Sequence, residues 1–209
     1  CYCSRSRIHQ VLSAPHEGEA RPVYDGHCRN LTPEERESMT KNPCWRVRME
    51  ESTISFTDLF YGTITRTLKA GTDDFVVRRA DGLVAYQLAV SIDDGEMGIT
   101  HVFRGNDLLD STPGQAWLIQ KLGYQVPAYG HLPLLVDTRG IRLSKRQTGI
   151  TVRELRNRGL RPEDLIGLLL HLAGGLPELR PVSLEEALED FPFEKLTALQ
   201  KKHIVLPVS

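Results

Sequence analysis

The sequence lacks the features that mark a membrane protein or a disulfide-stapled secreted protein. No apolar run approaches the roughly 18 residues that a membrane-spanning helix needs, and the longest, LIGLLLHLAGG, is interrupted by His171 and by glycines. The amino-terminal stretch has no basic segment followed by an apolar one, as a secretory signal would. Four cysteines in 209 residues are too few for a disulfide scaffold. These absences favour a cytoplasmic protein with reduced thiols and no membrane partner.

A surplus of positive charge is also missing. The formal net charge is −1, which excludes the global basic surface typical of many nucleic-acid-binding proteins. The charge is nevertheless uneven, because residues 139–161 hold eight basic residues and one acidic residue, whereas residues 183–194 hold five acidic residues and no basic one. A solvated helix face is the simplest explanation of the basic stripe, and contact with phosphate groups is the alternative.

The composition and the hydrophobic pattern of the sequence change twice along the chain. Residues 1–44 begin with a stretch rich in Cys, His, Gly and Pro, which predicts irregular structure held by something other than an apolar core. Residues 45–150 mix strand-like and helical patterns, as in an α/β sheet protein. Residues 151–209 are predominantly helical in pattern. We therefore predict an α/β fold with an irregular amino-terminal segment and a small helical carboxyl-terminal region.

Local patterns predict most of the helices and strands. Three helix starts carry a Ser or Thr followed three residues later by Glu or Gln: Thr32 with Glu35, Thr112 with Gln115, and Ser183 with Glu186. Further helices are predicted in VRELRNRG, PEDLIGLLLHLAGG and FEKLTALQKKH. Strands are predicted in WRVRME, TISFTDLFYG, DDFVVRRA, ITHVFRG and LPLLVD, with turns at Asp81-Gly82 and Arg139-Gly140. The nearly continuous apolar run LVAYQLAVSI predicts a strand covered on both faces, as in a parallel sheet.

Three cysteines near the amino terminus have the spacing of a partial zinc site. Cys1 and Cys3 flank a single residue, and Cys28 follows about one loop later. Zinc prefers four Cys or His ligands in a tetrahedron and also accepts oxygen donors. The residues alone leave the fourth ligand open among Tyr24, His27, His16 and His9. Cys44 is expected to be a small buried residue.

Two further stretches hold residues suited to binding anions. In the loop GIRLSKRQTG, Lys145 could follow negative charge onto the pyrophosphate that leaves ATP during attack on the α-phosphate. Arg104 lies near the end of a predicted strand, where α/β sheets bind ligands, and its guanidinium could hold a carboxylate. Asp107 is the alternative, structural partner of Arg104. Tyr86 is expected to be a buried tyrosine that forms a local hydrogen bond.

Taken together, four segments resemble the catalytic domain of the glutamyl-tRNA synthetases, which are class I synthetases with a Rossmann-type fold. In chain order they are DDFVVRRADGLVAYQLAVSIDD, GITHVFRGNDLLDSTPGQ, YGHLPLLVD and RLSKR, and the last is similar to the family's KMSKS motif. The Cys-x-Cys pair followed by VYDGHCR resembles the zinc module of the glutamyl-Q tRNA(Asp) synthetases. These are short paralogues without an anticodon-binding domain.

The resemblance implies a role for each candidate residue. A structural Zn²⁺ would be held by Cys1, Cys3, Tyr24 and Cys28. L-Glutamate would be held by Tyr86 and Arg104, with Arg104 on a carboxylate. ATP, bound with Mg²⁺, would be contacted by the catalytic Lys145 within the loop Arg142, Leu143, Ser144, Lys145 and Arg146.

The implied reaction joins glutamate to queuosine at the wobble position of tRNA(Asp). The family's first Rossmann strands and HIGH motif are not found in the 209 residues, so we expect the chain to be the carboxyl-terminal portion of a catalytic domain that is monomeric when full-length. Strands without neighbours would expose sheet edges, so the isolated chain is expected to be poorly stable or to associate. Two alternatives are a truncated glutamyl-tRNA synthetase that charges a tRNA 3′ end and a non-catalytic, zinc-stabilised RNA-binding remnant.

Overall fold

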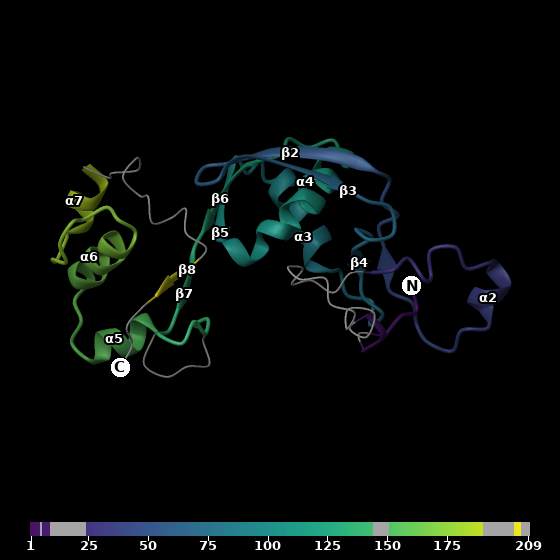
Figure 1. Ribbon diagram of the computed structural model, residues 1–209, viewed down its shortest axis with the longest axis horizontal. Helices are drawn as coiled ribbons and strands as arrows, with labels where there is room; N and C mark the ends of the chain where they lie inside the picture. The colour runs from purple at the N-terminus through teal and green to yellow at the C-terminus, as the bar shows by residue number, and fades with distance from the viewer. Residues whose placement is uncertain (5, 9–23, 144–150, 190–202, 206–209) are drawn as a thin grey trace. The chain divides into compact units, whose positions relative to one another are not determined.

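A computed structural model describes residues 1–4, 6–8, 24–143, 151–189 and 203–205 (Figure 1). The chain forms two compact units, which are described separately. The first unit comprises Cys1–Asp58, Gly62–Val102 and Leu109–Tyr129, and the second comprises Leu59–Tyr61, Phe103–Leu108 and Gly130–Ser209. Within the described part of the chain, no helix combines the length and the apolar character that crossing a membrane requires.

The main sheet has four strands in the order β3-β2-β6-β5 and is mixed rather than parallel. β2 (Ser52–Asp58) and β3 (Gly62–Leu68) form an antiparallel hairpin in which the alternate residues Ile54, Phe56 and Asp58 of β2 are buried. β6 (Ala128–Leu132) pairs with β2 in the parallel direction. β5 (His101–Gly105) completes the order. The prediction of an α/β fold is confirmed. The sheet is not parallel throughout, as was expected, because β2 and β3 form an antiparallel hairpin.

The apolar run LVAYQLAVSI is not a strand, so that prediction was wrong. Its greater part lies in α3 (Tyr86–Glu96). A short continuous apolar run lacks the period that separates a buried strand from a buried helix, and here Gln, Leu and Ala favour the helix. Leu88 packs against the core of the first unit. Gly98, with a φ of 62°, follows the last turn, where a glycine commonly ends a helix.

The turn predicted at Asp81-Gly82 is confirmed. Gly82 has a φ of 88°, which glycine tolerates because it has no Cβ. On the amino-terminal side of this turn, β4 (Val76–Arg78) pairs antiparallel with β1 (Trp45–Arg46). On its other side, the expected strand is reduced to an isolated bridge before α3 begins.

Helices begin at or next to the three starts that capping patterns predict: α2 (Pro33–Glu37), α4 (Thr112–Lys121) and α7 (Leu184–Glu189). The capping box of α2 is formed in full, although none of its five residues is buried. At α4 the N-cap is Ser111 rather than Thr112. The reason is that a 3₁₀ helix, η1 (Asn106–Ser111), runs directly into α4.

The second unit holds two more predicted helices and a small sheet. α5 (Val152–Asn157) and α6 (Pro162–Leu172) are present where the sequence predicts them. β7 (Leu134–Val136) pairs in parallel with β8 (His203–Val205). The helix predicted in FEKLTALQKKH is therefore wrong at its last residue, because His203 belongs to a strand, and residues 193–202 lie outside the described residues.

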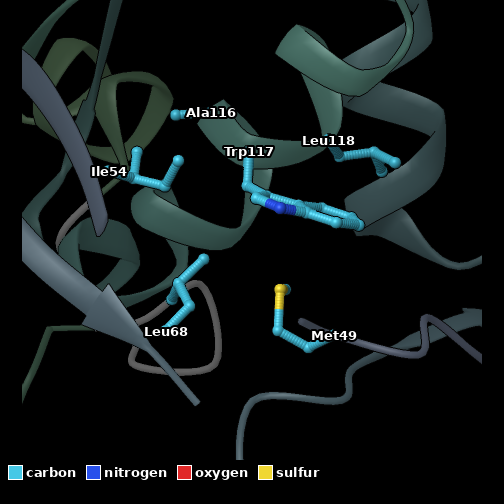
Figure 2. Close-up of a cluster of buried hydrophobic side chains, with 6 residues drawn as sticks. All are labelled: Met49, Ile54, Leu68, Ala116, Trp117 and Leu118. Carbon is cyan, nitrogen blue, oxygen red and sulfur yellow. The ribbon is translucent and has the colours of Figure 1, made fainter. Parts of the chain in front are cut away.

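The core of the first unit is a cluster of six buried side chains from β2, β3, α4 and the segment before β2 (Figure 2): Met49, Ile54, Leu68, Ala116, Trp117 and Leu118. Figure 2 shows the end of the Met49 side chain pointing toward the indole of Trp117. Met49 is fully buried although it lies outside the strands. The segment before β2 is thus fixed to the core by its side chain.

Replacing this methionine tests the assignment of the core. Met49→Ala is expected to lower the free energy of unfolding by about 2–5 kcal/mol, because it removes buried methylene groups and leaves a cavity. Urea unfolding followed by circular dichroism measures the change. Met39→Ala is the matched control, since Met39 is 38% exposed and its truncation should change stability by less than about 0.5 kcal/mol. Equal losses in the two variants would contradict the assigned core.

Candidate functional site

Three of the predicted zinc ligands lie together in the first unit. The sulfur atoms of Cys1, Cys3 and Cys28 are all within 4.8 Å of one another, and those of Cys3 and Cys28 are 3.5 Å apart. Zinc–sulfur bonds of about 2.3 Å in a tetrahedron would separate two sulfurs by roughly 3.8 Å. The main-chain nitrogen of Tyr2 also donates to the Cys28 sulfur at 3.3 Å. The spacing and the chemistry of these donors therefore fit a zinc ion.

Tyr24 is placed beside the cysteine cluster. Its hydroxyl oxygen accepts a hydrogen bond from the main-chain nitrogen of Cys28 at 2.9 Å, and burial raises the pKa of its phenol. The Arg46 guanidinium lies 4.2 Å from the centre of its ring. His27 is exposed and is not part of the cluster of metal-ligating atoms found among the described residues. His9 and His16 lie outside the described residues.

The thiol of Cys3 holds its proton tightly. Burial, reinforced by the neighbouring Cys28 sulfur, raises the pKa of Cys3 to about 11. At neutral pH a cation therefore has to displace a proton from this thiol, as thiolate ligands require. Cys44 is half-buried and does not belong to the cluster found in the described part of the chain. Its main chain exchanges two hydrogen bonds with Cys1, of 2.7 and 3.0 Å, which hold the first arm of the cluster in place.

An ion pair between Arg29 and Asp74 fastens the cysteine cluster to the core. The Arg29 guanidinium, one residue beyond Cys28, bonds both carboxylate oxygens of Asp74 at 2.5–2.6 Å and the carbonyl of Met49 at 2.7 Å. Asp74 is 4% exposed and also accepts from the amides of Met49 and Gly71. The sequence carries no local signal of this contact, because it joins residues 45 positions apart.

In the second unit, Arg104 is held by a buried histidine that sequence reasoning did not identify. Arg104 lies in β5, and its Nε donates to Nε2 of His131 at 3.1 Å. His131 is fully buried in β6. An acceptor at Nε2 places the proton of the neutral ring on Nδ1. Asp107, the alternative partner of Arg104, instead bonds Arg142 at 2.6 Å.

Tyr86 is 53% exposed at the first turn of α3, so the expectation of a buried tyrosine was wrong. The tyrosine was expected to be buried because it was assigned to a strand covered on both faces. It instead begins a helix, and a helix residue can face solvent. Tyr86 belongs to the first unit and Arg104 to the second.

The loop that resembles KMSKS begins on an ordered turn. Asp137 accepts hydrogen bonds from the amides of Ile141 and Arg139 and from the Arg139 side chain. These bonds, that from Ile141 foremost, hold the pKa of Asp137 below its usual range. Beyond the turn, the amide of Leu143 bonds Leu135 of β7. The predicted ATP-binding residues Ser144, Lys145 and Arg146 lie outside the described residues.

Comparison with known proteins identifies the class. The family described as "tRNA synthetases class I (E and Q), catalytic domain" matches residues 1–198. The chain therefore belongs to this family of class I synthetases.

Within the family, the curated relatives have two names. "Glutamyl-Q tRNA(Asp) synthetase" of Symbiobacterium thermophilum is 47% identical over 203 residues, which cover 94% of this chain and 62% of the relative. The protein of that name from Nitratidesulfovibrio vulgaris is 43% identical over 87% of this chain and 57% of its own length. "Glutamate–tRNA ligase 2" of Coxiella burnetii is 34% identical over 91% and 40%. The chain thus spans about 60% of the length of the glutamyl-Q relatives.

Solved structures agree with the family. The glutamate–tRNA synthetase of Elizabethkingia anophelis superimposes with a TM-score of 0.70 at 25% identity, covering all of this chain and 47% of that one. A glutamate–tRNA ligase of Elizabethkingia meningosepticum, solved in complex with its amino acid, gives a TM-score of 0.68 over 98% of this chain and 46% of that one.

Removing one charge of the Arg29–Asp74 pair tests its anchoring role. Asp74→Asn is expected to lower the free energy of unfolding by about 3–5 kcal/mol, because it leaves a poorly solvated guanidinium without its counterion. Asp81→Asn is the control: Asp81 pairs with Arg79 on the surface, where such pairs contribute about 0–1 kcal/mol. Thermal unfolding of the three proteins makes the comparison. A loss in the Asp74 variant no larger than in the control would contradict the anchoring role.

Proposed function

We propose that a protein containing this chain activates glutamate with ATP and transfers the glutamyl group to queuosine at the wobble position of tRNA(Asp). One observation carries the choice of acceptor. Identity is 47% to a glutamyl-Q tRNA(Asp) synthetase and 34% to a glutamate–tRNA ligase, and the chain covers 62% of the former and 40% of the latter. The cysteine cluster beside Tyr24 supports the same choice, since it resembles the zinc module of the glutamyl-Q enzymes.

Zn²⁺ is proposed to be structural and held by Cys1, Cys3, Cys28 and Tyr24. Four protein ligands fill a tetrahedron and leave no open position for a substrate, as in structural zinc sites. When bound, the ion would supply a cross-link between the segment of Cys1 and Cys3 and the segment of Tyr24 and Cys28. Arg29 and Asp74 carry this cross-link to the core.

Glutamate is proposed to be held by Arg104 and Tyr86. The hydrogen bond that Arg104 donates to His131 fixes the plane of its guanidinium, and a fixed guanidinium can bind a carboxylate with two parallel hydrogen bonds. The exposed Tyr86 hydroxyl offers a further hydrogen bond to the amino acid. Both residues act by orienting the substrate, so the rate contribution is one of positioning.

Activation consists of attack by a glutamate carboxylate oxygen on the α-phosphorus of ATP, and the bond to pyrophosphate breaks. Lys145 is proposed to neutralise the charge that develops on the leaving pyrophosphate. Mg²⁺ bound with ATP would add positive charge at the same phosphates. A cyclopentene hydroxyl of queuosine then attacks the acyl carbon, AMP leaves with the carboxyl oxygen bound to phosphorus, and the hydroxyl proton is released.

The group that receives the glutamyl residue distinguishes the proposed function from its alternatives. A protein containing this chain is incubated with glutamate, ATP and tRNA(Asp) that carries queuosine, and the digested tRNA is analysed by mass spectrometry for glutamyl-queuosine. The same tRNA without queuosine is the control, and it should gain no glutamate. Charging of the 3′ end of tRNA(Glu) would instead support the second candidate, a glutamate–tRNA ligase activity, which the solved neighbours favour. Absence of any ATP–pyrophosphate exchange would favour the non-catalytic alternative.

Metal content tests the proposed zinc ligands separately. The chain is expected to bind one zinc ion, and Cys28→Ser should remove most of it and lower the temperature of unfolding, because one of four ligands is lost. Cys44→Ser should retain the metal, since Cys44 lies outside the cluster. Elemental analysis after dialysis gives the occupancy. Loss of zinc from the Cys44 variant alone would contradict the assignment.

A further inference from the structure

One of the two tryptophans of the chain is on the surface. Trp45, in β1, is 59% exposed, whereas Trp117 is 9% exposed in the core of the same unit. A tryptophan placed for packing would be largely buried, because its large apolar surface stabilises only when water is removed. The exposed indole of Trp45 is therefore open to contact with a ligand.

An arginine lies against this tryptophan. The Arg78 guanidinium is 5.2 Å from the centre of the Trp45 ring, and its Nε donates to the carbonyl of Gly82 at 3.2 Å, which fixes its orientation. Arg79, the next residue, is paired with Asp81 at 2.5 Å. Among the described residues, no acidic side chain forms an ion pair with Arg78. Its charge is thus available to a phosphate.

Strand pairing places a third exposed residue on the same face of the sheet as Trp45 and Arg78. Trp45 pairs with Arg78 across β1 and β4, and Arg78 forms a bridge with Val84 beyond the turn. Directly paired residues of neighbouring strands lie on one face of a sheet. Val84 is 56% exposed. Two residues further along the same unit lies Tyr86, proposed above to contact glutamate.

We propose that Trp45, Arg78 and Val84, here called the Trp45 row, form a stacking site for an unpaired nucleotide of the RNA substrate. The base stacks on the open surface of the indole, and Arg78 neutralises the adjoining phosphate. Aromatic stacking combined with a nearby cation is the usual way in which proteins hold single-stranded nucleotides. The choice of RNA as occupant rests on the proposed function and on the positive charge of Arg78, which favours a polyanion and forms no ion pair within the described part of the chain.

The test uses the fluorescence of the chain, which contains two tryptophans. The full chain is titrated with an unmodified tRNA(Asp) transcript in the absence of ATP and glutamate. Stacking on Trp45 should quench its emission, and Trp45→Phe should abolish the quenching because only the buried Trp117 remains. Trp45→Ala should weaken binding about tenfold, as expected for loss of one base–aromatic contact. Thermal unfolding verifies that both variants are folded.

Arg78→Ala should weaken binding and reduce the slope of log affinity against log salt by roughly 0.7, the contribution of one phosphate contact on a single strand. Lys69→Ala is the charge-matched control in the same unit, because Lys69 is exposed and belongs to the loop after β3. This variant should retain the quenching and bind within about twofold of the unsubstituted chain, which is smaller than the loss of a stacking contact.

Three outcomes would overturn the stacking site: no quenching by RNA, undiminished binding by Trp45→Ala, or stronger quenching by an acidic peptide than by the transcript. The last would assign the Trp45 row to a protein partner. Because ATP and glutamate are absent, the result does not depend on the glutamyl transfer. Quenching without formation of glutamyl-queuosine would refute the proposed function but support the stacking site. Formation of glutamyl-queuosine without quenching would support the proposed function but refute the stacking site.

Discussion

The first unit depends on a single buried charge pair. Arg29 joins the segment of Cys28 to the carboxylate of Asp74 and to the main chain of Met49, so the cysteine cluster and the apolar core share one set of hydrogen bonds. A pair this poorly solvated is costly to break from either side. Any ion bound by the cysteines therefore stabilises the packing around Met49 as well, because a ligand that binds only the folded state shifts the folding equilibrium toward it.

In the second unit, a hydrogen bond to a buried histidine holds a candidate site residue in position. Arg104 reaches the end of β5 with its Nε bound to a buried imidazole of β6, and the neighbouring Asp107 is occupied by Arg142. The bond to His131 fixes the plane of the Arg104 guanidinium, and a guanidinium held in a fixed plane can bind a carboxylate with two parallel hydrogen bonds.

Local signals were sufficient for much of the fold but not for the contacts that build the site. The capping box at Thr32 and the turn at Asp81-Gly82 are encoded within four residues, and both were predicted correctly. The run around Tyr86 was misassigned because continuous apolar sequence has no period, and only packing against the rest of the unit decides between helix and strand. Arg29–Asp74 and Arg104–His131 join distant residues, so no pattern in one sequence reveals them.

α2 shows what weak tertiary support implies. It is closed by a capping box, yet none of its residues is buried. Beyond its own hydrogen bonds, the Tyr2 hydroxyl donates to the carbonyl of Arg36 at a long 3.5 Å. Five residues are far below the length at which a helix is stable on its own, and a local opening here would cost little free energy while the core stays folded. Its amides should therefore exchange with solvent early, and substitutions on its surface can accumulate at almost no cost to the stability of the remainder.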